Sequence, residues 1–557
     1  MRNRGNTQER PSSIPTPHTR RRAHRRILVT LACTLLTTAC THPSPTPTAP
    51  SQPPITPPPV APETPIRTNT RAAGPSLFPA DITDDATRRI AQLIYRGLYS
   101  IDPKGKAVPG LANTMTTSNH TTWTAKIDPR AQFADGTPIT AEDIAASWTL
   151  TATRTKTTGV ATPLTLIEGY DEHDPKNTDP LSGLNVINPT TLQITLTTPT
   201  PRFNKLSADI TMAPFPAKQR TDPTALATKP TGNGPYRLEK PWTGKGTYTL
   251  RPNSTYMSPQ QVANTGIEFH TYDNLDTAYL DLRAGKLDVI DELPPNRIQE
   301  ATDAKLQVAQ QPVGMNQTLD FPTTPEWQGI EGRNRKAAIG AALDRNTIAE
   351  TNYDGATTPA TDLASPVVDG YSNDICGTLC IHDPDQARAL WSPNSPHNIT
   401  IAYLSNGTEA VSAGAICSAL VETLPITCDT RPYPNEQALA NAVRNGKING
   451  PYLRTWRMRQ RDLGAFLVPR YSPDAQENWN SYTDPLAELH LRLANAATKN
   501  SAAMAAHQEA ERYILRGLPS LPLWSFNATT TSTSAVTGVV TDPTGVPVYT
   551  HITRPPQ

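Results

Sequence analysis

Residues 133–148, with the sequence FADGTPITAEDIAASW, constrain the fold of this chain more than any other stretch. Asp135 and Gly136 are typical of a tight turn, because glycine adopts positive φ at little cost. Thr140 stands where the N-cap of a helix belongs, and Asp143, three residues later, can bond back to the Thr140 backbone as in a capping box. We therefore expect a turn followed by a capped helix, a unit that by itself indicates no function.

The same stretch also resembles a family motif. It follows the pattern F-x-D-G-x-P-(I/L)-T-A-E-D-(V/I) of the extracellular solute-binding proteins of ABC importers, of the oligopeptide, dipeptide and nickel type. The residues that carry the match are Phe133, Asp135, Gly136, Thr140, Ala141, Glu142 and Asp143.

Weaker matches to this family keep the family's order between residues 75 and 545. They lie at 95–98 (Y-x-G-L), 109–112 (P-x-L-A), 232–236 (G-x-G-P-Y), 253–256 (N-x-x-Y), 280–288, 335–345 and 519–523. The third contains Gly234, Pro235 and Tyr236, and a phosphate-binding loop is its rival interpretation. Because the Lys-Ser/Thr pair of a P-loop is missing, we interpret it as a structural turn before a strand.

The resemblance implies an α/β protein with the two-lobe, type II periplasmic-binding-protein fold and an extra inserted subdomain. We expect one discontinuous lobe, 75–315 plus 520–557, with the insert at about 111–225. The other lobe is expected at 316–519. We also expect a helix over residues 90–99, where apolar residues recur at helical spacing before a glycine.

The N-terminus reads as an export signal. A basic cluster at 20–26 precedes an apolar run at 27–36, which is too short for the roughly 20 residues of a membrane span. The segment 36–40, LTTAC, resembles a lipobox, so we expect residues 1–40 to be a lipoprotein signal peptide with Cys40 lipidated. Alternatives are lipidation of Cys33 or an ordinary signal peptide, and the export route, general or twin-arginine, stays open.

A tether is expected after this signal. Residues 41–74 are rich in Pro, Thr and Ser, a composition that favours an extended, disordered segment. The predicted location is thus the outer face of the cell membrane, held by a lipid anchor.

The remaining four cysteines, Cys376, Cys380, Cys417 and Cys428, suit two disulfides in an exported chain. Three connectivities are open. Local pairing, the first cysteine with the second and the third with the fourth, is the simplest. Four thiolates could instead bind zinc, but export and the irregular spacing argue against that site.

Composition excludes a nucleic-acid binder, because the net charge is only +1 and the one basic cluster lies in the export signal. No zinc-protease, serine-hydrolase or paired-CxxC motif is present. Asp135, Glu142 and Asp143 could serve as acid and base, but turn and cap explain them better. We expect a monomeric binding protein that is not an enzyme and needs no metal or cofactor.

The resemblance also places a ligand-binding segment at 456–467, where the family has a tryptophan followed three residues later by an aspartate that pairs with a peptide's ammonium group. Here Trp456 is followed by Arg459, with Arg461 nearby. A guanidinium repels an ammonium and suits a carboxylate or phosphate. We therefore expect Trp456, Arg459 and Arg461 to contact a ligand bearing an anionic group; the alternative is that these arginines are solvated.

The function implied by the resemblance is capture of an oligopeptide or related solute in a closing cleft, for delivery to the permease and ATPase of an importer. Hinge closure of this kind is common to periplasmic binding proteins. An extracellular peptide-signal receptor with the same fold, and an exported hydrolase, are the alternatives.

Overall fold

The structure is a computed structural model of the chain. It describes residues 64–102, 106–160, 162–171, 173–174, 176–257, 261–405, 409–458, 461–473 and 475–555. The expected signal peptide with Cys40 and Cys33, most of the expected tether, and Arg459 lie outside these residues.

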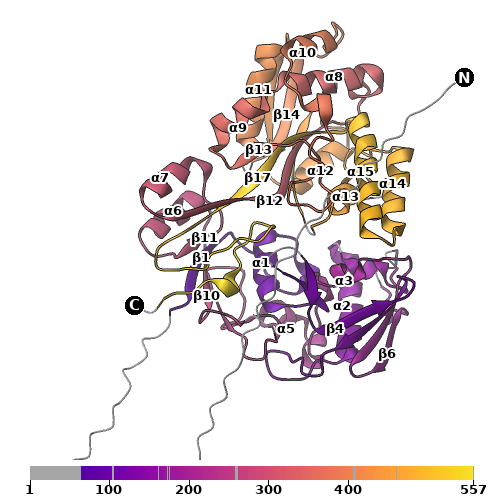
Figure 1. The fold of residues 1–557 in the computed structure, drawn as a ribbon, viewed down its shortest axis with the longest axis vertical. Coiled ribbons are helices and arrows are strands. Elements are labelled where there is room, and N and C mark those ends of the chain that lie inside the picture. The colour runs from indigo at the N-terminus through magenta and orange to yellow at the C-terminus, as the bar shows by residue number, and fades with distance from the viewer. Residues whose placement is uncertain are drawn as a thin grey trace, which may run out of the picture. The chain divides into compact units, whose positions relative to one another are not determined.

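One mixed sheet runs through the described chain in the order β15-β14-β16-β12-β17-β11-β1-β10-β9-β8, with β13 paired to β17 (Figure 1). Its strands are β1 (Ile66–Thr70), β8 (Tyr236–Leu238), β9 (Thr247–Pro252), β10 (Ile267–Thr271), β11 (Val289–Ile290), β12 (Gln307–Asp320), β13 (Thr357–Pro359), β14 (Asn398–Leu404), β15 (Thr427–Tyr433), β16 (Tyr452–Arg457) and β17 (Ser520–Ser532).

The helices that accompany this sheet follow in chain order. They are α1 (Asp85–Ile94), α4 (Ala217–Arg220), α5 (Pro223–Thr228), α6 (Leu275–Arg283), α7 (Ile298–Asp303), α8 (Gly329–Ala342), α9 (Arg345–Tyr353), α10 (Pro384–Leu390), α11 (Glu409–Thr423), α12 (Glu436–Arg444), α13 (Gly464–Tyr471), α14 (Pro485–Ala496) and α15 (Asn500–Gly517). None of the described helices has the length and apolar character needed to cross a membrane.

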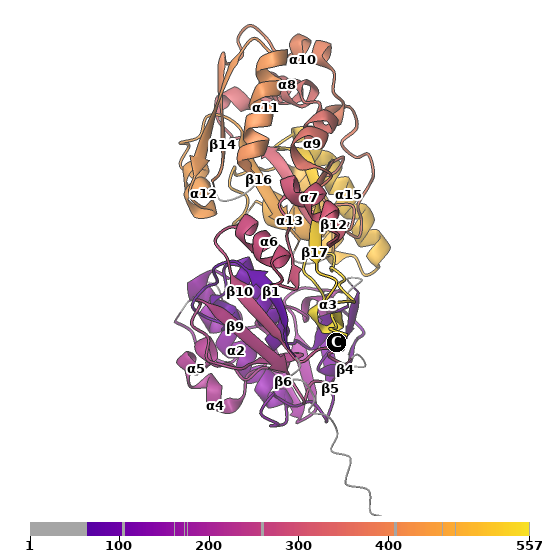
Figure 2. The ribbon, with the colours of Figure 1, turned by 90° about the vertical axis from the view of Figure 1, so that its left-hand side faces the viewer.

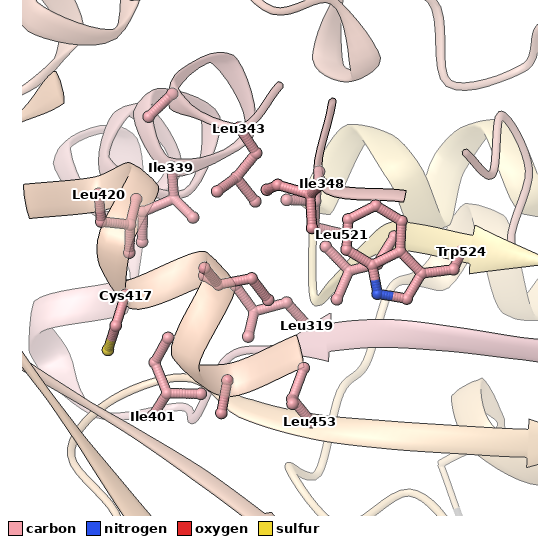
Figure 3. Packing of buried hydrophobic residues seen from close by; sticks show 14 of the residues in the cluster. Leu319, Ile339, Leu343, Ile348, Ile401, Cys417, Leu420, Leu453, Leu521 and Trp524 are labelled. Carbon is pink, nitrogen blue, oxygen red and sulfur yellow. The ribbon is translucent and has the colours of Figure 1, made fainter. Parts of the chain in front are cut away.

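The long antiparallel pair β12 and β17 joins two halves of the sheet. We call them the β14 half, with β13 to β16 and α8 to α15, and the β1 half, with β1, β8 to β11 and α1 (Figure 2). Each half has its own apolar cluster. The cluster of the β14 half contains Leu319 and Leu453 together with Leu521 and Trp524 of β17 (Figure 3). The first part of β17 therefore belongs to the β14 half, although the expected boundary at 519/520 gives it to the other lobe. The remaining lobe boundaries stay a prediction.

A second, four-stranded sheet has the order β4-β5-β7-β6 and lies within the expected insert. Its elements are β4 (Ala112–Thr117), β5 (Thr122–Ile127), β6 (Leu184–Asn188) and β7 (Thr191–Thr195), with helices α2 (Ala141–Thr158) and α3 (Phe203–Leu206) and a short β2 (Tyr99–Ile101) and β3 (Ala107–Pro109) hairpin beside it. Trp123, Phe133 and Trp148 lie in its separate apolar cluster. We call this unit the small sheet.

The predicted cap of α2 is present. The Thr140 backbone N–H donates to the Asp143 carboxylate at 3.0 Å, and the Asp143 N–H donates to the Thr140 hydroxyl at 3.2 Å. Arg220 bonds the same carboxylate at 2.8 Å. Farther along the helix, the Trp148 indole N–H donates to the Met212 carbonyl at 2.7 Å. Local capping thus begins the helix, and burial of its tryptophan fixes the face that it presents.

Two expectations near the start of the fold are wrong in their bounds. The helix expected over 90–99 is α1, which begins and ends five residues earlier than expected. The Asp84 carboxylate caps its start, and Tyr95 already has an extended backbone. The tether expected to continue to residue 74 ends before β1, which pairs in parallel with β10. The β-branched Ile and Thr side chains of β1 favour a strand once a partner is available.

The four described cysteines form Cys376–Cys380 and Cys417–Cys428 disulfides, the local connectivity, so they do not make a four-thiolate zinc site. The first bridge lies beside a buried guanidinium. Arg345 donates to the carbonyls of Ala360 and Pro522, each at 2.9 Å, and to the Cys380 carbonyl. This arginine joins the bridge to β17.

Candidate functional site

A cavity of about 1040 Å³ lies between the β14 half and the rest of the molecule. The β14 half contributes Met458 and Arg461. Other lining residues come from α1 and the residues that follow it, the β2–β3 hairpin, the small sheet with α3, Pro235, the 256–261 loop and the C-terminal segment 542–551. Among the described residues, its walls carry the basic side chains Arg89, Arg96, Arg130, Lys205 and Arg461 and the acidic side chains Asp102, Asp128 and Asp542. The cavity is large enough for a short peptide or a solute of similar size.

The predicted ligand-binding segment reaches this cavity only in part. Arg461 lines it, and its Nε lies 3.3 Å from the Asp369 carboxylate. Trp456 is only 7% exposed and packs with Leu463 and Phe466 in an apolar cluster of the β14 half. Its indole N–H donates to the Ala465 carbonyl at 3.3 Å. A ligand contact by Trp456 or by Arg459 stays a prediction.

Three of the family-like segments converge on the opposite wall. The 232–236 loop closes over the end of α1, where the Asn233 and Gly234 N–H groups donate to the Ile94 carbonyl at 3.0 and 2.8 Å. A Cβ at Gly232 would stand 2.0 Å from that carbonyl oxygen, so only glycine allows this approach. The Asn253 amide then donates to the Gly234 carbonyl at 2.9 Å.

The start of the 133–148 motif is hydrogen-bonded to the 232–236 loop and to the 253–256 segment. The Ala134 N–H donates to the Gly232 carbonyl at 2.8 Å, and the Thr255 hydroxyl donates to the Phe133 carbonyl at 3.0 Å. Asp135 accepts from the Thr137 N–H at 3.0 Å within the turn, whereas Glu142 is exposed. Both carboxylates therefore lie where the turn and the helix N-terminus account for them, and neither lines the cavity among the described residues.

Most of the cavity's charge is paired. Arg130 forms a two-point ion pair with Asp128, and its hydrogen bonds lower the pKa of Asp128 to about 2. Arg89 pairs with Asp291, while Lys205 and Arg461 share Asp369. Burial lowers the pKa of Lys205, with Asp369 opposing that shift.

The C-terminal segment closes one end of the cavity. The Gly314 N–H of β12 donates to the Pro543 carbonyl at 2.7 Å, and Arg457 donates to the Thr544 carbonyl at 2.7 Å. Gly545 has φ of +88°, and a Cβ there would stand 3.1 Å from the Arg457 guanidinium. This turn needs glycine for its backbone and for the approach of the arginine.

Sequence reasoning missed most of the cavity's residues. Arg96 fills the open position of the Y-x-G-L match and Tyr256 ends the N-x-x-Y match, and both line the cavity. Their presence inside recognised motifs was the available signal. The contribution of 542–551 had no such signal, because it depends on the path of the chain after β17.

Comparison with known proteins identifies a family and relatives that this chain resembles. The family model for bacterial extracellular solute-binding proteins, family 5 Middle, matches residues 106–482. The periplasmic murein peptide-binding protein MppA of Escherichia coli is 23% identical over 473 residues, which cover 81% of this chain and 86% of MppA. The oligopeptide-binding protein OppA of Bacillus subtilis is 24% identical over 58% of this chain, and the match spans only 61% of OppA.

Solved structures agree at the level of the fold. The murein tripeptide-binding protein MppA of E. coli superposes with a TM-score of 0.72 at 19% identity, over 89% of this chain and 99% of that one. The substrate-binding protein CtaP of Listeria monocytogenes gives 0.74 at 18% identity, over 88% and 99%. With a family model that covers most of its length, this two-lobe α/β chain belongs to the family 5 bacterial extracellular solute-binding proteins.

Proposed function

We propose that the protein captures an oligopeptide or a related solute in the cavity between its halves and delivers it to the permease and ATPase of an ABC importer. The observation that carries this proposal is the cavity of about 1040 Å³, with Met458 and Arg461 on one side. On the other side lies the wall that residues 89–97 of α1 and the chain after it contribute, which we call the α1 wall. The peptide-binding relatives MppA and OppA support the substrate class. The protein acts alone in capture, as a monomer, and performs no chemistry on the solute.

Recovery of the natural solute tests this proposal. Protein purified from its host under native conditions should carry a peptide or peptide-like compound that denaturation releases and mass spectrometry identifies. Release of a chemically altered product from a supplied peptide would instead favour a hydrolase. Protein that yields no bound solute and retains no member of a peptide library would contradict the proposal.

We also propose that Cys40 carries a lipid anchor at the outer face of the membrane. The lipobox-like segment 36–40 and the Pro-rich residues that follow it support this location. Stable anchoring requires acyl chains, so Cys40→Ser should release the protein into the medium while Cys33→Ser leaves it on the membrane. Fractionation of cells expressing each variant measures this, and the opposite pattern would assign lipidation to Cys33.

A further inference from the structure

Arg96 differs from the other basic side chains of the cavity. Arg89, Arg130, Lys205 and Arg461 each have a carboxylate within ion-pair distance. Among the described residues, no ion pair includes Arg96. The undescribed stretches 103–105 and 258–260, which adjoin lining residues near Arg96 in the sequence, contain no acid.

The backbone of Arg96 is held at both of its polar groups by a single side chain. The Arg96 N–H donates to the Asn233 side-chain oxygen at 2.9 Å, and the Asn233 amide donates to the Arg96 carbonyl at 2.8 Å. Asn233 itself is only 3% exposed and lies in the 232–236 loop. The 232–236 loop therefore fixes the position of Arg96 on the cavity wall.

The Arg96 guanidinium is also held in place, by hydrogen bonds to uncharged oxygen atoms. Its Nε donates to the Ser100 hydroxyl at 2.6 Å, and its two terminal nitrogens donate to the carbonyls of Met257 at 2.7 Å and Pro109 at 3.0 Å. The Tyr256 ring centre lies 5.3 Å from the guanidinium carbon. These three bonds use three of the five N–H groups, so each terminal nitrogen retains one N–H that can donate to a carboxylate.

An unmatched charge of this kind has a consequence for binding. Water can solvate Arg96 while the cavity is open, but a ligand that fills the cavity displaces that water. A desolvated guanidinium without an anion is strongly unfavourable, whereas a carboxylate oriented by a fixed fork is favourable. The ligand is therefore expected to supply the missing negative charge.

We propose that Arg96 is a specificity-determining residue that binds a carboxylate of the ligand, which in a peptide is the C-terminal carboxylate. This inference rests on the proposed function, because it needs a solute in the cavity. It assigns the anionic end of that solute to the α1 wall, independently of any contact by Arg459.

The test uses two tripeptide libraries without Asp or Glu, one with free C-terminal carboxylates and one with C-terminal amides. Native mass spectrometry of the full-length protein selects the best-bound sequence, and calorimetry then compares its acid and amide forms. Wild type should bind the acid at least about tenfold more tightly. Arg96→Gln should bind the acid only as well as the amide, with affinity for the amide changed by less than about twofold. Arg96→Lys, which keeps the charge without the fork, should fall between them.

The matched control is Arg251→Gln, the same substitution at a guanidinium that pairs with Glu239 outside the cavity. It should keep the full preference for the acid. Equal binding of acid and amide by wild type, or an undiminished preference in Arg96→Gln, overturns the inference and leaves the proposed function standing. Failure of wild type to bind either library contradicts the proposed function and this inference with it. Should Arg96→Gln not fold, the wild-type comparison and Arg96→Lys decide.

Discussion

Two buried carboxyl groups, Asp362 and Glu511, interact in the core of the β14 half. Asp362 accepts from the N–H groups of Ala364 and Ser372 at 2.7 and 2.8 Å, and Glu511 accepts from the Leu363 N–H at 2.8 Å. Burial, and after it the negative charge of Asp362, raises the pKa of Glu511 well above its ordinary range. Burial also raises the pKa of Asp362. The pair is therefore most stable when it holds a proton.

This raised pKa fixes the sign of a pH effect. The contribution of Glu511 to stability is fully present below its unfolded-state pKa of about 4.3 and is lost as the pH rises toward its folded-state pKa. Relative to Glu511→Gln, the free energy of unfolding of wild type should fall by up to about 1.4 kcal/mol per pH unit over that window. Urea denaturation from pH 4.5 to 8 measures it. The control is Glu509→Gln on the same helix, where the carboxylate pairs with Arg512 at the surface; parallel curves for wild type and Glu511→Gln would refute the shared proton.

At the scale of helices and strands, local chemistry was predictable where a residue's own neighbours decide the outcome. Thr140 and Asp143 are three residues apart, so the cap of α2 could be read directly from their spacing. The end of α1 could not, because the Ile94 carbonyl is satisfied by the 232–236 loop, far away in the sequence. β1 was likewise hidden, since its threonines resemble tether composition until β10 and β11 pair with them.

The residues of the site were likewise predictable only where the local sequence decides their position. The family resemblance directed attention to 456–467, and Arg461 does reach the cavity. The resemblance could not show that Arg461 lines the cavity while the Trp456 side chain is buried against Leu463 and Phe466. The direction of each side chain depends on how β16 packs against α13. The Y-x-G-L match contains Arg96 but did not mark it as a site residue, since its significance comes from the absence of an ion-pair partner among the described residues, which only the structure shows.

At the scale of the whole fold, α3 links the small sheet to the β14 half beside the cavity. Arg202 forms an ion pair with Asp462, and the Lys205 ammonium donates to the Arg461 carbonyl at 2.7 Å. The Asp462 carboxylate also accepts from the Gly464 N–H at 2.9 Å, which fixes it at the start of α13. Separation of the small sheet from the β14 half at this point requires these bonds to break.

Removal of this link should therefore shift the protein toward an open form. A hydrogen bond to a charged group contributes about 1.5–3 kcal/mol, so Asp462→Asn should enlarge the radius of gyration without ligand and weaken binding of the natural solute about tenfold or more. Small-angle scattering, with and without the solute recovered from the host, measures both forms. Glu488→Gln, which removes a surface charge beside Arg492, serves as control and should match wild type. Scattering of wild type that does not change at saturating solute would contradict closure itself.

The place of β17 in the sheet has a consequence for the order of assembly. It lies between β12 and β11, and β11 in turn pairs with β1, the first strand of the described chain. A ribosome delivers residues from first to last, so β17, which joins the two halves, emerges only after all the other described strands of the sheet. Pairings this distant in sequence also form slowly. The growing chain is thus kept from completing its sheet while it is being made, the condition in which a polypeptide can still be threaded through a membrane pore.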